Sequence, residues 1–248
     1  MLSSELPPIL AIETSTELGS IALWQAGVCH LRYCPSGVAN SLTLLPLIAR
    51  LLDEQGIGFA DLQGIAFGAG PGAFTGLRVA CAVAQGLAFA RKLALLPVNT
   101  LAALALASQA ERVLVALDAR MGEVYFGCFE RRLGDAFIAQ ASAVPAVAMH
   151  ALSAVGVYAP DQVPLPPSGE WLACGNALAA YPSLVQRLSP YVRDFLPDLM
   201  PNAEAVLRLA LPCFARGESV AAAEAVPIYV RDKVAQTTAE RLARGGKA

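Results

Sequence analysis

The chain has 248 residues, of which 56% are hydrophobic and 15% charged, a composition that excludes an intrinsically disordered protein and supplies a sizeable core. A net charge of -2 argues against a protein that binds nucleic acid unaided, because such proteins usually carry a basic surface. The six cysteines form no CxxC pair, which fits a reducing cytoplasm. No apolar run reaches the roughly 20 residues that span a bilayer, so we expect a soluble protein without a membrane segment.

The first elements are a strand, a loop and a second strand, because the apolar ILAIE is followed by turn residues and then by IALWQ. Next, SLTLLPLIARLLDEQG has the apolar spacing of one helix face and predicts a helix over 43–55. Thr43 would cap this helix, which puts Pro46 in the first turn, where its missing N–H costs nothing. A start at Leu42 would instead let Pro46 kink the helix.

Glycines are concentrated in GAGPGAFTG, residues 68–76, which we call the glycine loop; it lies between a short apolar strand and a second predicted helix, 75–92. A P-loop needs a lysine after its last glycine, but leucine follows Gly76. A dinucleotide-binding loop matches the spacing, yet no acidic residue lies between Asp61 and Glu111 to hold a ribose. Two interpretations remain: a tight strand-to-helix turn, which we favour, and an anion site at the helix N-terminus.

The pattern restarts near residue 110, after a further strand (LALLPVN) and helix (TLAALALASQ). VLVALDARMGEVYFGCFE repeats the plan of ILAIETSTELGSIALWQ, so that Asp118 corresponds to Glu13 and Gly122 to Gly19. The match is one hairpin long; chance could produce it, but we favour duplication. It divides the chain into an N-terminal lobe at 1–109, a C-terminal lobe at 110–230 and a polar tail at 231–248.

The later elements are less regular. The proline-rich 157–170 reads as a surface connector, WLACGNA as a strand entering a loop and LAAYPSLVQRL as a weak helix. NAEAVLRLALPCFARG predicts a helix that Asn202 caps and Gly217 ends. Strands alternating with helices indicate an α/β protein whose mixed or parallel sheets carry helical layers.

Residues that could carry chemistry are sparse. His30 and His150 are far apart, so no HxxxH pair can present two imidazoles on one helix face, and we predict no metal site. Glu13 and Asp118 could act as an acid/base pair, but no histidine, lysine or cysteine cluster accompanies them, and we favour turn hydrogen bonds for both and predict no catalytic residue. Ser15 has no neighbouring histidine, so a peptidase gains little support.

Five segments occur in an order typical of one family: ILAIETST, GPGAFTGLR, VAQGLA, VLVALDARMGEVY and VPIYVRDKVA. Together they resemble the TsaB (YeaZ) family, the bacterial subunit needed to make N6-threonylcarbamoyladenosine beside the tRNA anticodon. The resemblance covers most of the chain and is weakest over 130–200. It implies an α/β, actin/hexokinase-like (ASKHA) fold of duplicated ribonuclease-H-like lobes, each with a mixed sheet flanked by helices.

The resemblance also implies a function and partners. The chain would be a non-catalytic, cytoplasmic subunit that activates the catalytic homologue TsaD by forming a heterodimer with it. It would work with the ATPase TsaE and meet tRNA through the complex. Whether the isolated chain is a monomer or a homodimer stays open at this point. The alternative is a stand-alone nucleotide-binding phosphotransferase or ATPase of the same fold, and a peptidase is a more distant third.

Related proteins carry DTST in the first loop, where this chain has ETST. The extra methylene would displace the acid from a precise magnesium site, so we expect no cofactor bound by this chain alone, with ATP and metal used by partner subunits. A nucleotide or anion, if one binds, would contact Glu13, Thr14, Ser15, Gly70 and Gly72.

Pairing with a partner is expected through helices of the N-terminal lobe, where small side chains allow close approach of another helix. Gly86 supports this expectation. Glycine within a helix costs roughly 1 kcal/mol against alanine, so its presence suggests a close contact in which even a methyl group would collide. The expected contact residues are Leu44, Leu45, Ile48, Leu52, Leu77, Ala80 and Ala84. Candidates for tRNA phosphate contacts are Arg78, Arg120, Arg231 and Lys233, although solvated surface charge explains each of them as well.

Overall fold

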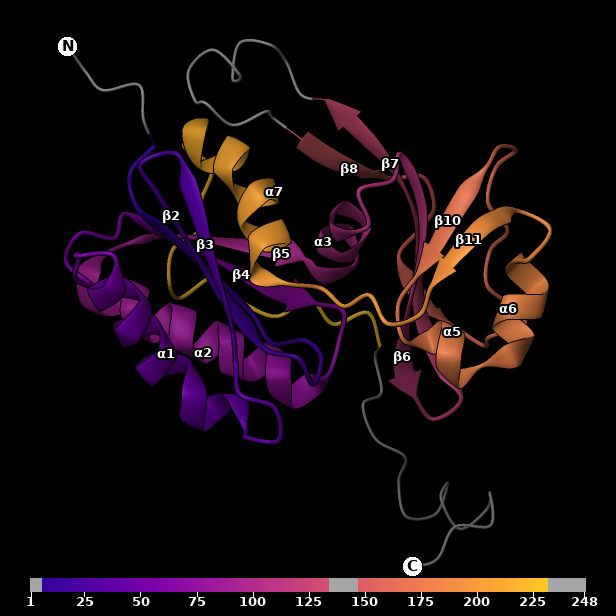
Figure 1. Ribbon diagram of the computed structural model, residues 1–248, viewed down its shortest axis with the longest axis horizontal. Coiled ribbons are helices and arrows are strands. Elements are labelled where there is room, and N and C mark those ends of the chain that lie inside the picture. The colour runs from indigo at the N-terminus through magenta and orange to yellow at the C-terminus, as the bar shows by residue number, and fades with distance from the viewer. Residues whose placement is uncertain (1–5, 134–146, 232–248) are drawn as a thin grey trace, which may run out of the picture.

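The computed structural model describes residues 6–133 and 147–231, and these form two lobes that each contain a mixed sheet (Figure 1). The first sheet has the order β3-β2-β1-β4-β5. Its strands are β1 (Ile9–Glu13), β2 (Ser20–Gln25), β3 (Val28–Tyr33), β4 (Gly64–Gly70) and β5 (Ala94–Asn99). β1 pairs antiparallel with β2 and parallel with β4, so the sheet combines a meander with a parallel half.

The second sheet repeats this plan. Its strands are β6 (Arg112–Arg120), β7 (Glu123–Leu133), β8 (Val147–Ala151), β10 (Trp171–Cys174) and β11 (Val192–Leu196). The order is β8-β7-β6-β10-β11, again with two antiparallel pairings followed by two parallel ones, and a short β9 (Gly156–Tyr158) also pairs with β7. The repeat that the sequence showed over one hairpin therefore extends to five strands, and the actin/hexokinase-like duplicated fold is confirmed.

Helices cover both faces of the first sheet. α1 (Asn40–Glu54) and α2 (Phe74–Arg91) pack on one face, where Leu10, Ile12 and Phe67 meet the inner stripes of both helices. α3 (Thr100–Ala107) and α7 (Ala203–Ala215) cover the other face. The short α5 (Ala177–Ala180) and α6 (Pro182–Leu188) cover the second sheet, and α3 also packs on β6 and β7, so it lies in the core between the lobes.

The first helix begins earlier than its pattern predicted. α1 starts at Asn40, and Thr43 does not cap it but donates back to the carbonyl groups of Ala39 and Asn40 at 3.5 and 3.4 Å. Pro46 therefore lies inside the helix, at an exposed position. The second helix matches its prediction within one residue at each end.

The last described elements return to the first lobe. α7 contacts β1, β2, β4 and β5, and its residues Ala203 to Leu211 share a core with Ile9 and Trp24. We predicted that the C-terminal lobe ends at residue 230. In the structure the chain leaves this lobe before α7, and α7 belongs to the first lobe. Of the helices in 6–133 and 147–231, none is long and apolar enough to cross a membrane.

Candidate functional site

The glycine loop lies beside the loop that follows β1, at the carboxyl ends of β1 and β4, the edge where α/β sheets usually bind ligands. Two hydrogen bonds join the loops: Ala73 N donates to Ser15 O at 2.7 Å, and Thr14 Oγ1 donates to Gly76 O at 2.8 Å. The turn into α2 is thereby tied to the first strand.

The glycines of this loop permit close contact with the first loop. A methyl group at Gly72 would lie 2.6 Å from Ser15 Cβ and 2.8 Å from Ser15 O. A methyl group at Gly76 would overlap the carbonyl oxygen of Thr14, and one at Gly68 the carboxylate of Glu13. The space that a phosphate would need beside these glycines is filled by the chain itself, which favours the tight-turn interpretation of the loop.

Glu13 is fully buried and faces the protein interior. Its Oε1 accepts from Ser15 N at 2.6 Å, and its Oε2 accepts from Thr100 Oγ1 at 3.4 Å; the same hydroxyl accepts from Gly70 N at 3.1 Å. Burial raises the pKa of the Glu13 carboxyl, and hydrogen bonds from Ser15 and Thr100 act in the opposite direction. As arranged, this acid organises the two loops and is not available as a metal ligand.

A cleft of about 310 Å³ lies between the lobes. The first lobe contributes Ser15, Thr16 and the glycine loop, and the second contributes Asp118 and Asn176. The buried hydroxyl of Thr16 has no hydrogen-bond partner among the described residues. Glu13 does not line the cleft, so only one of the two corresponding acids faces it.

Asp118 is held rigidly at the cleft wall. Its Oδ1 accepts from Tyr181 Oη and Arg120 N, both at 2.8 Å, and its Oδ2 pairs with the guanidinium of Arg120 at 3.1 Å. Its own N–H donates to Asn176 Oδ1 at 2.9 Å. The bond from Arg120 N is the turn hydrogen bond that the sequence favoured. The contacts with Asn176 and Tyr181 had no signal in the sequence, because these residues reach Asp118 from a distant part of the chain.

The predicted partner contacts require a correction. Six of the seven side chains are at most 2% exposed and belong to the core of their own lobe: Leu44, Ile48, Leu52, Leu77, Ala80 and Ala84. They cannot form a contact surface, because the first sheet takes the most apolar stripe of each helix. Only Leu45, at 48% exposed, can meet another molecule.

The outer faces of α1 and α2 nevertheless form an apolar surface, which we call the α1–α2 face. Its large side chains are Leu42, 71% exposed, Leu45, and Phe89, 83% exposed. Its other apolar or small exposed members are Pro46, Ala49, Ala82, Gly86 and Ala90, and the same two helices also expose charged side chains: Arg50, Asp53, Glu54, Arg78 and Arg91. The two helices lie side by side beneath the first sheet, so these positions belong to one flank of the molecule (Figure 1).

The four predicted tRNA contacts have different environments. Arg78 is exposed and stacks over the Phe74 ring, and Arg120 is exposed but paired with Asp118. Arg231 is committed inside the protein, where its guanidinium donates to Ala119 O and pairs with Glu123, so it is not a free phosphate ligand. Lys233 lies outside the described residues.

The histidines stand in different sheets, His30 on β3 and His150 on β8. Within the described ranges, no group of three His, Cys, Asp or Glu side chains could hold a metal ion. All six cysteines are buried or half-buried, and burial is the main cause of a raised thiol pKa in each of them. A raised pKa keeps a thiol protonated and unreactive.

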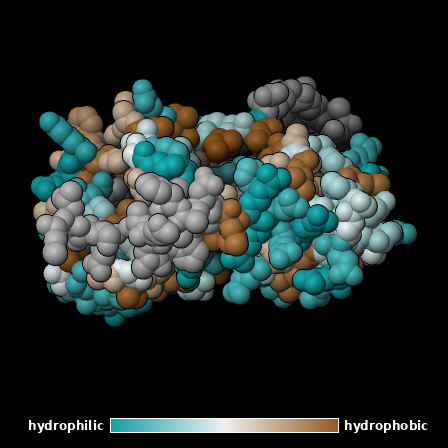
Figure 2. Space-filling model, turned by 90° about the horizontal axis from the view of Figure 1, so that it is seen from above, coloured by the Kyte–Doolittle hydropathy of each residue, from teal (hydrophilic) through white to brown (hydrophobic). Residues whose placement is uncertain are grey.

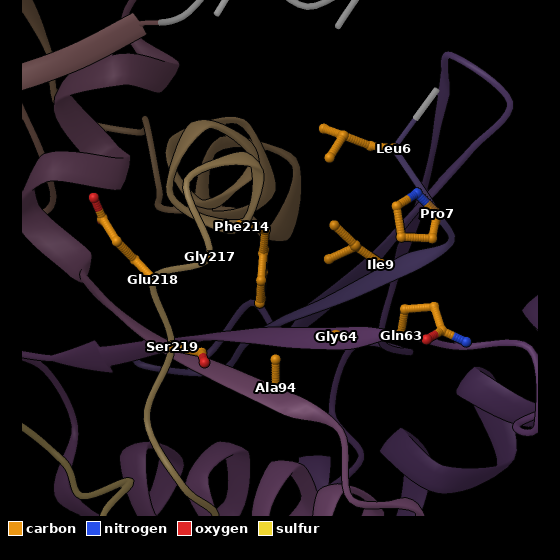
Figure 3. A pocket seen from close by; sticks show the side chains of 10 residues that line it. All are labelled: Leu6, Pro7, Ile9, Gln63, Gly64, Ala94, Phe214, Gly217, Glu218 and Ser219. Carbon is orange, nitrogen blue, oxygen red and sulfur yellow. The ribbon is translucent and has the colours of Figure 1, made fainter. Parts of the chain in front are cut away.

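Two apolar hollows lie away from the cleft. One, of about 160 Å³, sits where β1, β4 and β5 begin, and the ring of Phe214 faces Gly64 there (Figure 3). The other lies between α7 and β8, and the space-filling view shows hydrophobic residues around the hollow between the lobes on that face (Figure 2). Neither hollow contains the glycine loop or Asp118, so neither is the site that the sequence motifs build.

Known proteins share this sequence and fold. The family described as "TsaD: tRNA N6-adenosine threonylcarbamoyltransferase" matches residues 38–239. The "tRNA threonylcarbamoyladenosine biosynthesis protein TsaB" of Escherichia coli (strain K12) is 36% identical over 92% of this chain and 96% of its own length. Its namesake from Haemophilus influenzae is 32% identical over 91% of this chain and 94% of its own length.

A solved structure described as "YeaZ from Pseudomonas aeruginosa" is 37% identical, covers 90% of this chain and 100% of its own, and has a TM-score of 0.78. These similarities extend across both lobes. They therefore include the glycine loop, the β6–β7 turn and the helices of the α1–α2 face.

Proposed function

Since the chain belongs to the TsaB (YeaZ) family, we propose that it is a non-catalytic subunit of the machinery that makes N6-threonylcarbamoyladenosine in tRNA. In this proposal it binds a TsaD-like catalytic subunit in the cytoplasm and acts with a TsaE-like ATPase. It meets tRNA only as part of the assembly, consistent with its net charge of -2. When alone, it pairs with a second copy of itself.

The α1–α2 face is the observation that carries this proposal. Leu42, Leu45 and Phe89 are large apolar groups that stay exposed, and exposed apolar side chains gathered on one surface mark protein–protein contacts. The small residues between them, Ala82 and Gly86, leave room for the backbone of another helix. The burial of Glu13 supports the proposal that the chain is non-catalytic. Its carboxyl group packs against Gly68 with no exposed surface, so it cannot take part in chemistry at the cleft.

Reconstitution tests the role directly. Purified TsaD-like and TsaE-like subunits, tRNA and substrates are combined with or without this protein, and threonylcarbamoyladenosine is measured by mass spectrometry of tRNA digests. We expect modification only when the chain is present. Equal modification in its absence would reject the proposed role.

The contact surface is tested with Leu45→Arg. A charged side chain in the centre of an apolar interface should weaken the heterodimer by about 100-fold or more, because an unpaired charge would be buried there. Leu165→Arg is the matched control, since Leu165 is 46% exposed but lies on the second lobe. Titration calorimetry with the TsaD-like subunit gives both affinities; equal affinities would show that the α1–α2 face is not the contact surface.

A second candidate function is a stand-alone nucleotide-binding enzyme of the same fold. The unpartnered Thr16 hydroxyl and the Asp118 carboxylate at the cleft favour it, because both could contact a polar ligand. Titration calorimetry of the isolated chain with ATP and Mg²⁺ separates the two candidates. Tight binding together with ATP turnover would favour the enzyme, and the absence of both favours the non-catalytic subunit.

A further inference from the structure

The described chain ends in a segment, residues 220–231, that runs along the first lobe and which we call the C-terminal strap. The strap begins with a β-bridge to β5, in which Val220 N donates to Leu95 O at 2.8 Å. Gln85 Nε2 on α2 then donates to two strap carbonyl groups at 3.0 and 2.9 Å, one of them that of Ala225, which is fully buried. The first half of the strap is thus built into the fold.

The strap next passes the glycine loop. Ile228 N donates to Ala69 O at 2.7 Å. A methyl group at Gly70 would lie 2.9 Å from Ile228 O, and Gly70 has a φ of +112°, which favours glycine. The strap therefore contacts the backbone of Ala69 and Gly70, where β4 ends in the glycine loop.

Its next residue contacts the start of α2. The ring of Tyr229 lies 5.8 Å from that of Phe74, and its hydroxyl accepts from Arg78 Nε at 3.2 Å. The Arg78 guanidinium in turn lies 3.8 Å from the centre of the Phe74 ring. Aromatic and cation–π contacts of this kind are favourable, so the strap helps to order the start of α2.

Arg231 then crosses to the second lobe and binds the β6–β7 turn. Its Nη1 donates to Ala119 O at 3.0 Å, its Nη2 to Arg120 O at 3.4 Å, and the guanidinium forms an ion pair with Glu123. The Arg231 side chain is 13% exposed and that of Glu123 is 43% exposed, so the bonds to Ala119 O and Glu123 are partly shielded from water, whereas the bond to Arg120 O is exposed.

The turn that Arg231 binds has an unusual backbone. Arg120, Met121 and Gly122 have φ angles of 62°, 60° and 78°, in the left-handed region that is unfavourable for a residue with a side chain. Arg231 binds the carbonyl groups that lead into this turn, so it holds a strained segment of one lobe from an anchor on the other.

We propose that the C-terminal strap is an interlobe latch that Arg231 closes on the β6–β7 turn. While the latch is closed, the glycine loop and the start of α2 are fixed against the second lobe and one wall of the cleft is set. When Arg231 lets go, Ile228 and Tyr229 are freed from the first lobe, and the cleft and the adjoining α2 loosen together. The latch thereby couples the cleft to the helix that carries part of the α1–α2 face.

Hydrogen exchange with mass spectrometry of the full chain tests the latch. In Arg231→Ala we expect about tenfold faster amide exchange in peptides covering 69–77 and 119–124, with no change in α6, because opening of the latch exposes both lobes at their contact. Arg216→Ala is the control: Arg216 precedes the strap, and its side chain bonds to neighbouring groups of the described chain, chiefly Glu218. Its exchange at both segments should equal that of the wild type.

Two further variants guard against general destabilisation. Glu123→Gln removes the charge but keeps the shape and should accelerate the same two segments more weakly, whereas Arg231→Lys should behave like Arg231→Ala, because an ammonium cannot replace the forked donors. Faster exchange confined to 226–231, or equally fast exchange in Arg216→Ala, would overturn the proposal. If Arg231→Ala fails to fold, unchanged exchange in Glu123→Gln would overturn it.

Discussion

At the scale of single residues, Glu13 is the most constrained ionisable group among the described residues. It has no contact with solvent, and Ser15 N and Thr100 Oγ1 use its oxygens to fix the ends of two loops. The sequence indicated a turn hydrogen bond at this position. It could not indicate the burial, which results from Gly68 and Thr100, residues brought there by β4 and α3.

This burial predicts a pH dependence of stability. The pKa of Glu13 is higher in the folded chain than its ordinary value of 4.5, so its burial costs nothing below that value and destabilises the fold as pH rises through the folded pKa. In Glu13→Gln this loss should disappear, and urea unfolding midpoints should fall less between acid and neutral pH than in the wild type. Glu17→Gln, at an exposed position of the same loop, is the control and should keep the wild-type slope; identical slopes for all three would contradict the prediction.

At the scale of elements, hydrophobic periodicity located α1 and α2 but assigned their faces wrongly. The stripe of Leu44, Ile48 and Leu52 is the strongest signal, and the protein's own sheet buries it. The outer face is marked only by scattered groups such as Leu42 and Phe89, which form a surface once two helices lie side by side. A partner-binding surface of this kind forms only when the two helices pack together. Each helix alone therefore shows little periodic pattern that would predict it.

Other elements show where local signals fail. Pro46 suggested a late start for α1, but an exposed proline inside a helix forfeits one hydrogen bond and clashes with the preceding turn, and the buried stripe outweighs this cost. LAAYPSLVQRL splits into α5 and α6 at Tyr181 and Pro182, since the residue before a proline avoids helical geometry. β3 was not predicted, because its exposed and half-buried residues lack a clear alternation.

The exposed glycine of α2 gives a test at this scale. A methyl group at Gly86 meets nothing within 4 Å, so Gly86→Ala should stabilise the isolated chain by about 0.5–1 kcal/mol, the helix-propensity gain. If a partner helix packs there, the same methyl should weaken the heterodimer by about tenfold. Thermal unfolding measures the first effect and calorimetry the second; a stabilised chain with unchanged affinity would place Gly86 outside the contact.

At the scale of the whole molecule, two lobes with the same strand order are joined through shared helices. α3 packs on both sheets, and Leu101 and Leu104 share a core with Val113 and Val115 of the second lobe. The sequence repeat predicted two related lobes correctly, from one hairpin. It could not reveal that α7 returns to the first lobe. The apolar pattern of a helix shows that one face is buried, but not which sheet buries it.

The joined core predicts cooperative unfolding. Trp24 lies in β2 of the first lobe and Trp171 in β10 of the second, and both are buried. In Trp24→Phe and Trp171→Phe, fluorescence of the remaining tryptophan should follow the same urea transition as far-UV circular dichroism, because the lobes unfold as one unit. A fluorescence midpoint separated from the circular dichroism midpoint in either variant would show that the lobes unfold independently.

The return of α7 has a consequence during synthesis. The strands of the first sheet leave the ribosome early, but the helix that shields Ile9, Ala11 and Trp24 emerges only after the entire second lobe. Until then only α3 covers that apolar face of the nascent sheet, and the part that α7 shields is exposed. Translation thus creates an interval in which the core of the first lobe is incomplete, and that interval ends when α7 leaves the ribosome.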